Sequence, residues 1–156
     1  MGQVYQNLVC FAVMVFNLFF VTRGRAWSKR SRKKPPKVYL ENKEKARSLV
    51  IARLEYFNQY YGFKWNRVSI KNTKRRWGSC SKKGNLNFCY KVALIDMELA
   101  DYIIVHELCH LGQFNHSKEF WKLVSRSILD YKAARDRLTK LGFSQINNYP
   151  VKVKEV

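Results

Sequence analysis

The spacing of apolar residues predicts a helix followed by two strands. Over Leu40–Tyr61 apolar side chains recur every three or four residues, as on one face of a helix, and Gly62 follows as a stop. Over Arg67–Ser79 the pattern changes to alternation, which is typical of a half-buried strand, and Leu86–Leu94 predicts a second strand. Because residues 81–85 are typical of a turn, we expect the two strands to pair as a hairpin.

Helical spacing then returns for the rest of the folded part. Three helices are expected there, over residues 96–111, 117–129 and 131–141. Asp96 and Ser117 are residue types that cap helix N-termini, and Gly142 is typical of a helix end. The order of helix, hairpin and three helices predicts one α+β domain over residues 38–144, with a tail over 145–156.

The chain before this domain has two different compositions. Residues 4–21 are strongly apolar but only just long enough to cross a bilayer, whereas residues 22–37 carry eight basic side chains and no acidic one. With the basic charge on the C-terminal side, the positive-inside rule predicts that the remainder is cytoplasmic. Residues 1–21 are therefore expected either to tether the protein to the inner face of the membrane or to pack on the domain. In the first case, the 22–37 linker would contact anionic lipid.

Composition narrows the class of protein. The 156 residues, 47% of them hydrophobic, suffice for one folded domain and exclude a wholly disordered chain. The net charge of +19 indicates either an anionic neighbour, lipid or nucleic acid, or a local explanation such as solubility, since the short linker over residues 22–37 supplies its largest share. The four cysteines include no Cys-x-x-Cys pair, which argues against a disulfide scaffold and a zinc ribbon.

The candidate metal-binding and catalytic residues lie between residues 106 and 116, a segment that contains all three histidines of the chain. His106-Glu107-Leu108-Cys109-His110 is a His-Glu-x-x-His pattern within a predicted helix, and a spacing of four places both imidazoles on one face. Glu107 lies about 100° further round the helix, where a general base can take a proton from a metal-bound water. Since the surrounding residues are apolar, these polar side chains are costly to bury unless something satisfies them.

A catalytic zinc needs a third protein ligand and leaves its fourth position to water. His116 is the first candidate, because Gly112 lets the chain turn back, while Glu119 or a distant carboxylate would be an alternative. Cys109 lies on the far side of the helix and is expected to be a small buried filler. The prediction is one Zn²⁺ per chain, held by His106, His110 and His116, with Glu107 as the catalytic base.

The sequence resembles the YgjP-like family of predicted zinc metallopeptidases and, more distantly, the SprT-like proteases. The similarity covers about residues 40–142 and rests on three blocks: Arg76-Trp77-Gly78-Ser79-Cys80-Ser81 followed by Gly84 and Leu86-Asn87-Phe88, then Asp101 to Leu111, and Asn115-His116-Ser117 with Phe120-Trp121. The resemblance implies a minimal zincin-like fold, the same three zinc ligands and the same catalytic base. The chain departs from the usual family pattern because it lacks a substantial N-terminal β region.

Three functions follow from these patterns. The first is a zinc-dependent metallohydrolase acting on a polypeptide substrate. The second is a basic, nucleic-acid-associated protein, which could also be a protease acting on DNA-bound proteins, and salt would weaken such binding steeply. The third is an interaction module around a structural zinc, which would need a fourth ligand that the sequence does not position.

For Arg76–Ser81 two interpretations stand: a strand that pairs with substrate, or a packing role with Trp77 in the core and Gly78 at a bulge.

Overall fold

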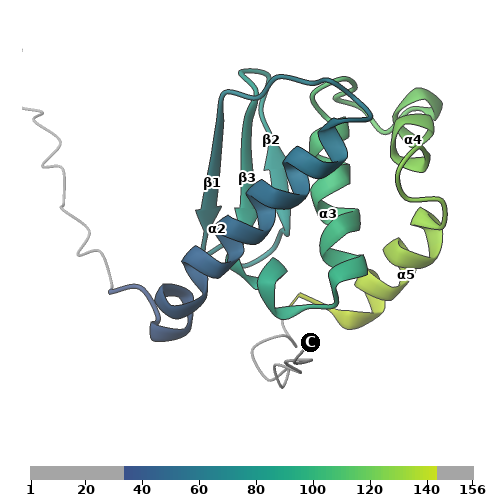
Figure 1. The fold of residues 1–156 in the computed structure, drawn as a ribbon. Helices are drawn as coiled ribbons and strands as arrows, with labels where there is room; N and C mark the ends of the chain where they lie inside the picture. The colour runs from purple at the N-terminus through teal and green to yellow at the C-terminus, as the bar shows by residue number, and fades with distance from the viewer. Residues whose placement is uncertain (1–33, 144–156) are drawn as a thin grey trace, which may run out of the picture. The chain divides into compact units, whose positions relative to one another are not determined.

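The computed structural model describes residues 34–143, and its arrangement is mixed α+β, as predicted (Figure 1). The predicted anchor, most of the basic linker and the predicted tail lie outside these residues. The elements are α2 (Lys37–Asn58), β1 (Arg67–Lys71), β2 (Gly78–Cys80), β3 (Asn85–Cys89), the 3-10 helix η1 (Tyr90–Leu94), α3 (Met97–Cys109), α4 (Lys118–Ser125) and α5 (Tyr131–Leu141).

Two helices build the core together with the sheet. Helix α2 runs diagonally across one face of the sheet and buries Ala46, Val50, Leu54 and Phe57, which are spaced by four, four and three residues (Figure 1). Helix α3 contacts α2 and β2 on one side and α4 and α5 on the other. Nine of its 13 residues are buried, so α3 is the central element of the fold.

The strand pairing corrects the predicted hairpin. The strand expected over residues 67–79 breaks after Lys71, and its first part, β1, pairs in parallel with β3. Only its end, β2, forms the antiparallel hairpin with β3, giving the strand order β1-β3-β2. Residues 72–77 between the two strands are irregular, and there the Thr73 hydroxyl donates to the Arg76 carbonyl at 2.7 Å.

The second predicted strand is also shorter than expected. It ends at Cys89, and residues 90–94 form the 3-10 helix η1, which packs against α2. Lys91 in η1 is only 6% exposed, and its ammonium donates to the Phe143 carbonyl at 3.2 Å and lies over the Phe143 ring. Trp77 meets the same ring edge-on, so residues beyond α5 are attached to the sheet side of the domain.

The three C-terminal helices lie close to their predicted ranges, and α5 matches its range. The Ser117 hydroxyl accepts from the Phe120 N–H, as expected of a cap, but α4 ends at Ser125 rather than near residue 129. Asp96 precedes α3 without capping it through its side chain, and its carboxylate accepts from Arg137 instead. Within residues 34–143, no helix combines the length and apolar character needed to cross a membrane.

Candidate metal centre

The structure brings the three histidines together at the C-terminal end of α3. His106 lies in the last turn of α3, His110 follows it one turn on as the C-cap residue, and His116 is in the loop that leads into α4. The Nε2 atom of His106 lies 3.2 Å from Nε2 of His110 and 3.1 Å from Nε2 of His116. Among the described residues, these three form the group with metal-ligand spacing, their ligand atoms all within 4.8 Å of one another. Glu119, the alternative third ligand, is not part of this group.

Neighbouring groups hold the imidazole rings in place. The Nδ1 atom of His110 is 2.9 Å from the Gln113 carbonyl oxygen, so Nδ1 carries the proton and Nε2 keeps its lone pair. The Phe120 ring stacks on His110 with centroids 4.6 Å apart, and the Trp121 ring stacks on His116. Because the Ser117 cap fixes the start of α4, it also fixes the backbone next to His116.

Burial keeps two of these rings uncharged. It lowers the pKa of His106 to about 3, with further contributions from His110 and His116, and it lowers the pKa of His110 as well. A neutral imidazole has one proton on its two nitrogens. The Nε2 atom of His106 therefore cannot donate hydrogen bonds to both His110 and His116. Its Nδ1 atom is buried and has no hydrogen-bond partner in the described part of the chain.

The donor atoms fit a divalent metal ion. Tetrahedral ligation with metal–nitrogen bonds of about 2.0–2.1 Å places two nitrogens roughly 3.3–3.4 Å apart. The spacings of 3.1 and 3.2 Å around His106 are close to this value. Without a cation, the lone pairs of the three imidazole nitrogens repel one another at this distance. A bound cation would offset that repulsion, because each lone pair would then point at positive charge.

Glu107 lies between α3 and β2 and is 7% exposed. Burial raises the pKa of its carboxyl group to about 8, although the nearby Arg76 guanidinium acts in the opposite direction. One carboxyl oxygen, Oε2, is buried with no hydrogen-bond partner among residues 34–143. A buried acid of this kind, next to a group of metal-ligand type, is a candidate proton acceptor.

Gly78 makes room for that carboxyl group. A Cβ atom at this position would lie 2.5 Å from Cγ and 2.6 Å from Oε1 of Glu107, closer than atoms can approach. The sequence suggested a bulge here, but β2 pairs regularly with β3 at this residue, and the glycine serves the close approach of a side chain. Sequence analysis missed this role, since no pattern shows what a glycine in a strand faces.

Two other residues on α3, Asp101 and Cys109, have structural roles. The Asp101 carboxylate accepts two hydrogen bonds from the Arg53 guanidinium, at 2.6 and 2.7 Å, and so ties α3 to α2. Cys109 is fully buried, as expected of a small filler.

A buried carboxyl group beside three clustered histidines, on an α+β fold, is the arrangement typical of a metallopeptidase, an enzyme that hydrolyses peptide bonds with the help of a metal ion. The model of the YgjP-like family, described as a YgjP-like metallopeptidase domain, matches residues 23–141. The chain belongs to the YgjP-like metallopeptidase family.

One solved structure agrees with this assignment. The chain is similar to the crystal structure of the metallopeptidase zymogen abylysin from Pyrococcus abyssi, with 30% identity and a TM-score of 0.54, over 59% of this chain and 94% of abylysin. It also matches the metallopeptidase zymogen jannalysin from Methanocaldococcus jannaschii, with 27% identity and a TM-score of 0.47, over 62% of this chain and 97% of jannalysin. None of the curated proteins matches the sequence.

Proposed function

We propose that the protein is a zinc peptidase in which His106, His110 and His116 bind the ion and Glu107 is the general base. The observation that carries the proposal is the approach of three imidazole nitrogens, 3.1 and 3.2 Å apart around His106. Two nitrogen donors on one helix face and a third from a nearby loop suit zinc, which favours imidazole ligands.

Each residue has a distinct part in the reaction. A zinc ion in this site would act as a Lewis acid toward the substrate carbonyl and lower the pKa of a bound water. Glu107 takes the proton from the attacking water and passes it to the leaving amine. Its buried carboxyl group leaves Oε2 without a hydrogen-bond partner among residues 34–143, so this oxygen is available for the exchange.

The substrate is proposed to bind along β2. This strand pairs with β3 on one side only, and its second edge has no strand partner among the described residues. An extended peptide added to that edge would receive backbone hydrogen bonds next to Glu107, because Gly78 of β2 contacts the Glu107 side chain.

Metal analysis of the purified full-length chain tests the proposal. Wild type is expected to contain about one zinc per chain by mass spectrometry, as a three-histidine site requires. His116→Ala should lose most of this zinc. Asn115→Ala is the matched control, because it changes an exposed neighbour in the same loop. Full zinc occupancy in His116→Ala would remove His116 from the ligand set.

The domain boundaries remain proposals of the same kind. Residues 38–144 are proposed as the catalytic domain, which agrees with described elements that begin at Lys37 and end at Leu141. The tether over residues 4–21 and the lipid contacts of the 22–37 linker stay predictions. No observation supports the nucleic-acid alternative.

A further inference from the structure

A second concave site lies beside the proposed metal centre. It is a pocket of about 460 Å³ between the loop that follows α2, the turn between β2 and β3, and the loop that follows α3. Its lining combines aromatic and basic side chains, among them Phe63, Trp65, Phe114, Lys64, Lys82 and Lys83. We call it the lysine pocket.

The lysine pocket shares a wall with the metal centre. Leu111 and Phe114, which line it, belong to the loop that connects His110 to His116. In the same loop the Gln113 carbonyl contacts the His110 ring, and Gly112 lies directly on Phe63. A Cβ atom on Gly112 would be 2.7 Å from Cζ of Phe63, so the wall of the pocket and the ligand loop are in contact.

Hydrogen bonds make the other two walls rigid. The Asn58 side chain accepts from the Phe63 N–H at 2.8 Å and donates to the Phe63 carbonyl at 2.9 Å. The Asn66 N–H donates to the Gly84 carbonyl at 2.8 Å, which joins the loop after α2 to the turn between β2 and β3. Gly84 has a φ of 71°, a conformation that favours glycine and fixes the shape of this turn. A site preformed in this way loses little entropy when it binds.

The chemistry of the lining identifies the occupant. The lining includes no acidic side chain, and within residues 34–143 the ammonium groups of Lys64, Lys82 and Lys83 form no ion pair. Three uncompensated positive charges around an aromatic floor complement a ligand that has both an apolar body and negative charge. Because Leu111 and Phe114 of the loop between His110 and His116 form one wall of the pocket, a polypeptide bound at the metal centre would be close enough to occupy it.

We propose that the lysine pocket is a substrate subsite that selects a large apolar residue next to an acidic one. The selection gives the enzyme sequence specificity on one side of the bond to be cleaved. This inference rests on the proposed function only for the position of the reacting bond, since the charge and shape of the pocket do not depend on the metal.

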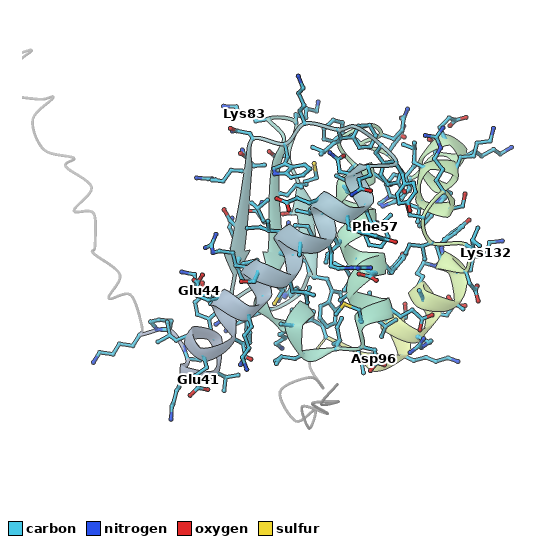
Figure 2. All side chains as sticks on the ribbon, viewed as in Figure 1. Glu41, Glu44, Phe57, Lys83, Asp96 and Lys132 are labelled. Atoms are coloured by element: carbon cyan, nitrogen blue, oxygen red, sulfur yellow. The ribbon has the colours of Figure 1, made fainter. Side chains whose placement is uncertain are left out.

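Cleavage of a proteome-derived peptide library by the full-length enzyme tests the proposal. The wild-type enzyme is expected to enrich Asp or Glu next to a large apolar residue, at a fixed distance from the cut. The double variant Lys82→Glu, Lys83→Glu should lose this enrichment while it still cleaves neutral peptides. Lys132→Glu is the matched control, because it reverses an exposed charge on α5, away from Lys83 (Figure 2). Wild-type cleavage with no acidic preference would overturn the proposal.

A binding measurement separates this proposal from the proposed function. Fluorescence polarisation on Glu107→Gln, which is not expected to cleave, compares two labelled heptapeptides with Asp-Phe or Asn-Phe at their centre. We expect about fivefold tighter binding of the Asp-Phe peptide, and no preference after Lys82→Glu, Lys83→Glu. If this result holds but wild type cleaves nothing, the pocket stands and the peptidase mechanism fails. If a single-stranded oligonucleotide binds through the two lysines and the peptides do not, the subsite proposal is wrong.

Discussion

Helices α2 and α3 pack against each other in the core, yet their residues are used differently. Helix α2 has 22 residues and buries one stripe of four, so most of its surface faces away from the core. Helix α3 has 13 residues and buries nine, including Glu107, and it carries His106, with His110 as its C-cap. On α2 the polar residues are where water can solvate them, whereas on α3 several are not.

The difference teaches where to look for chemistry in a small domain. Periodic apolar residues explain α2 completely, because burial of one face is enough to hold a helix on a sheet. In α3 burial on nearly all sides makes every polar residue costly, and each needs a partner or a function. Changes to the buried stripe of α2 should therefore affect stability but not activity, whereas changes to the polar residues of α3 should affect activity.

The largest expected effect is on activity, from Glu107→Gln in α3. The amide has the shape of the acid but cannot accept a proton, so kcat/KM should fall by at least about a hundredfold. The thermal midpoint and the metal content should be retained. Peptide hydrolysis and metal analysis on the same preparation check this, with Glu55→Gln on the exposed face of α2 as the control. Undiminished hydrolysis would contradict the assigned base.

The opposite pattern is expected for Leu54→Ala in α2. Leu54 is fully buried, and its truncation should lower the free energy of unfolding by about 2–5 kcal/mol. Hydrolysis per folded molecule should stay close to wild type, because Leu54 is not part of the metal centre. Urea unfolding followed by circular dichroism gives the first quantity. A neighbouring exposed change, Glu55→Ala, should be nearly neutral, and equal losses in both variants would break the comparison.

The reactivity of the Cys80 thiol measures how well the space between β2 and α3 is shielded from solvent. Burial, with the nearby Glu107 charge, raises the pKa of Cys80 to about 11 from an ordinary value of 9.0. The thiolate reacts, so alkylation by iodoacetamide at pH 8 should be roughly a hundredfold slower than for a free thiol. The rate should increase as the pH rises toward 11. Peptide mass spectrometry identifies the residue, with glutathione as the reference, and equal rates would contradict the buried environment.

Gly78→Ala asks whether β2 positions the base on α3. The added Cβ would force the Glu107 carboxyl group to move, and kcat should fall about tenfold while KM changes less. Ser79→Ala on the same strand is the control, because the Ser79 hydroxyl bonds to the Asn87 side chain rather than to Glu107. A similar loss of kcat in both variants would indicate a general effect on the strand.

The smallest effect is expected at the link between the two helices. The Arg53 and Asp101 side chains form two charge-assisted hydrogen bonds but keep 28% and 13% exposure, so solvent screens part of their attraction. A double-mutant cycle with Arg53→Met and Asp101→Asn should give a coupling energy of about 1 kcal/mol in unfolding. Activity should not change. A coupling near zero would mean that packing alone holds α2 on α3.

The sequence predicted the helices and strands of the fold better than it predicted which of them lie side by side. Helix α5 matched its predicted range because Gly142 ends it, with a φ of 60°. The strands were found, but their partners were not, because alternation shows that residues 67–71 lie on a sheet without showing which strand lies beside them. Residues 90–94 left the sheet because their packing on α2 overrides strand propensity.

The histidines could be grouped from the sequence because a spacing of four on a helix fixes their relative positions. Gly78 and the lysine pocket could not, since each depends on segments that only the folded chain brings together. The contact of Gly78 with Glu107 joins residues on β2 and α3, and the three walls of the pocket come from three separate loops. Local patterns carry no information about such distances.

The bond from Lys91 to Phe143 has a consequence for shortening the chain. Helix α5 ends at Leu141, which suggests a natural place for truncation. A chain cut there would leave the buried Lys91 ammonium without the acceptor that Phe143 provides, and an unpaired buried charge is far more costly than a frayed helix end. The smallest stable fragment must therefore extend to Phe143, two residues past the end of α5, so that the Lys91 ammonium keeps its acceptor.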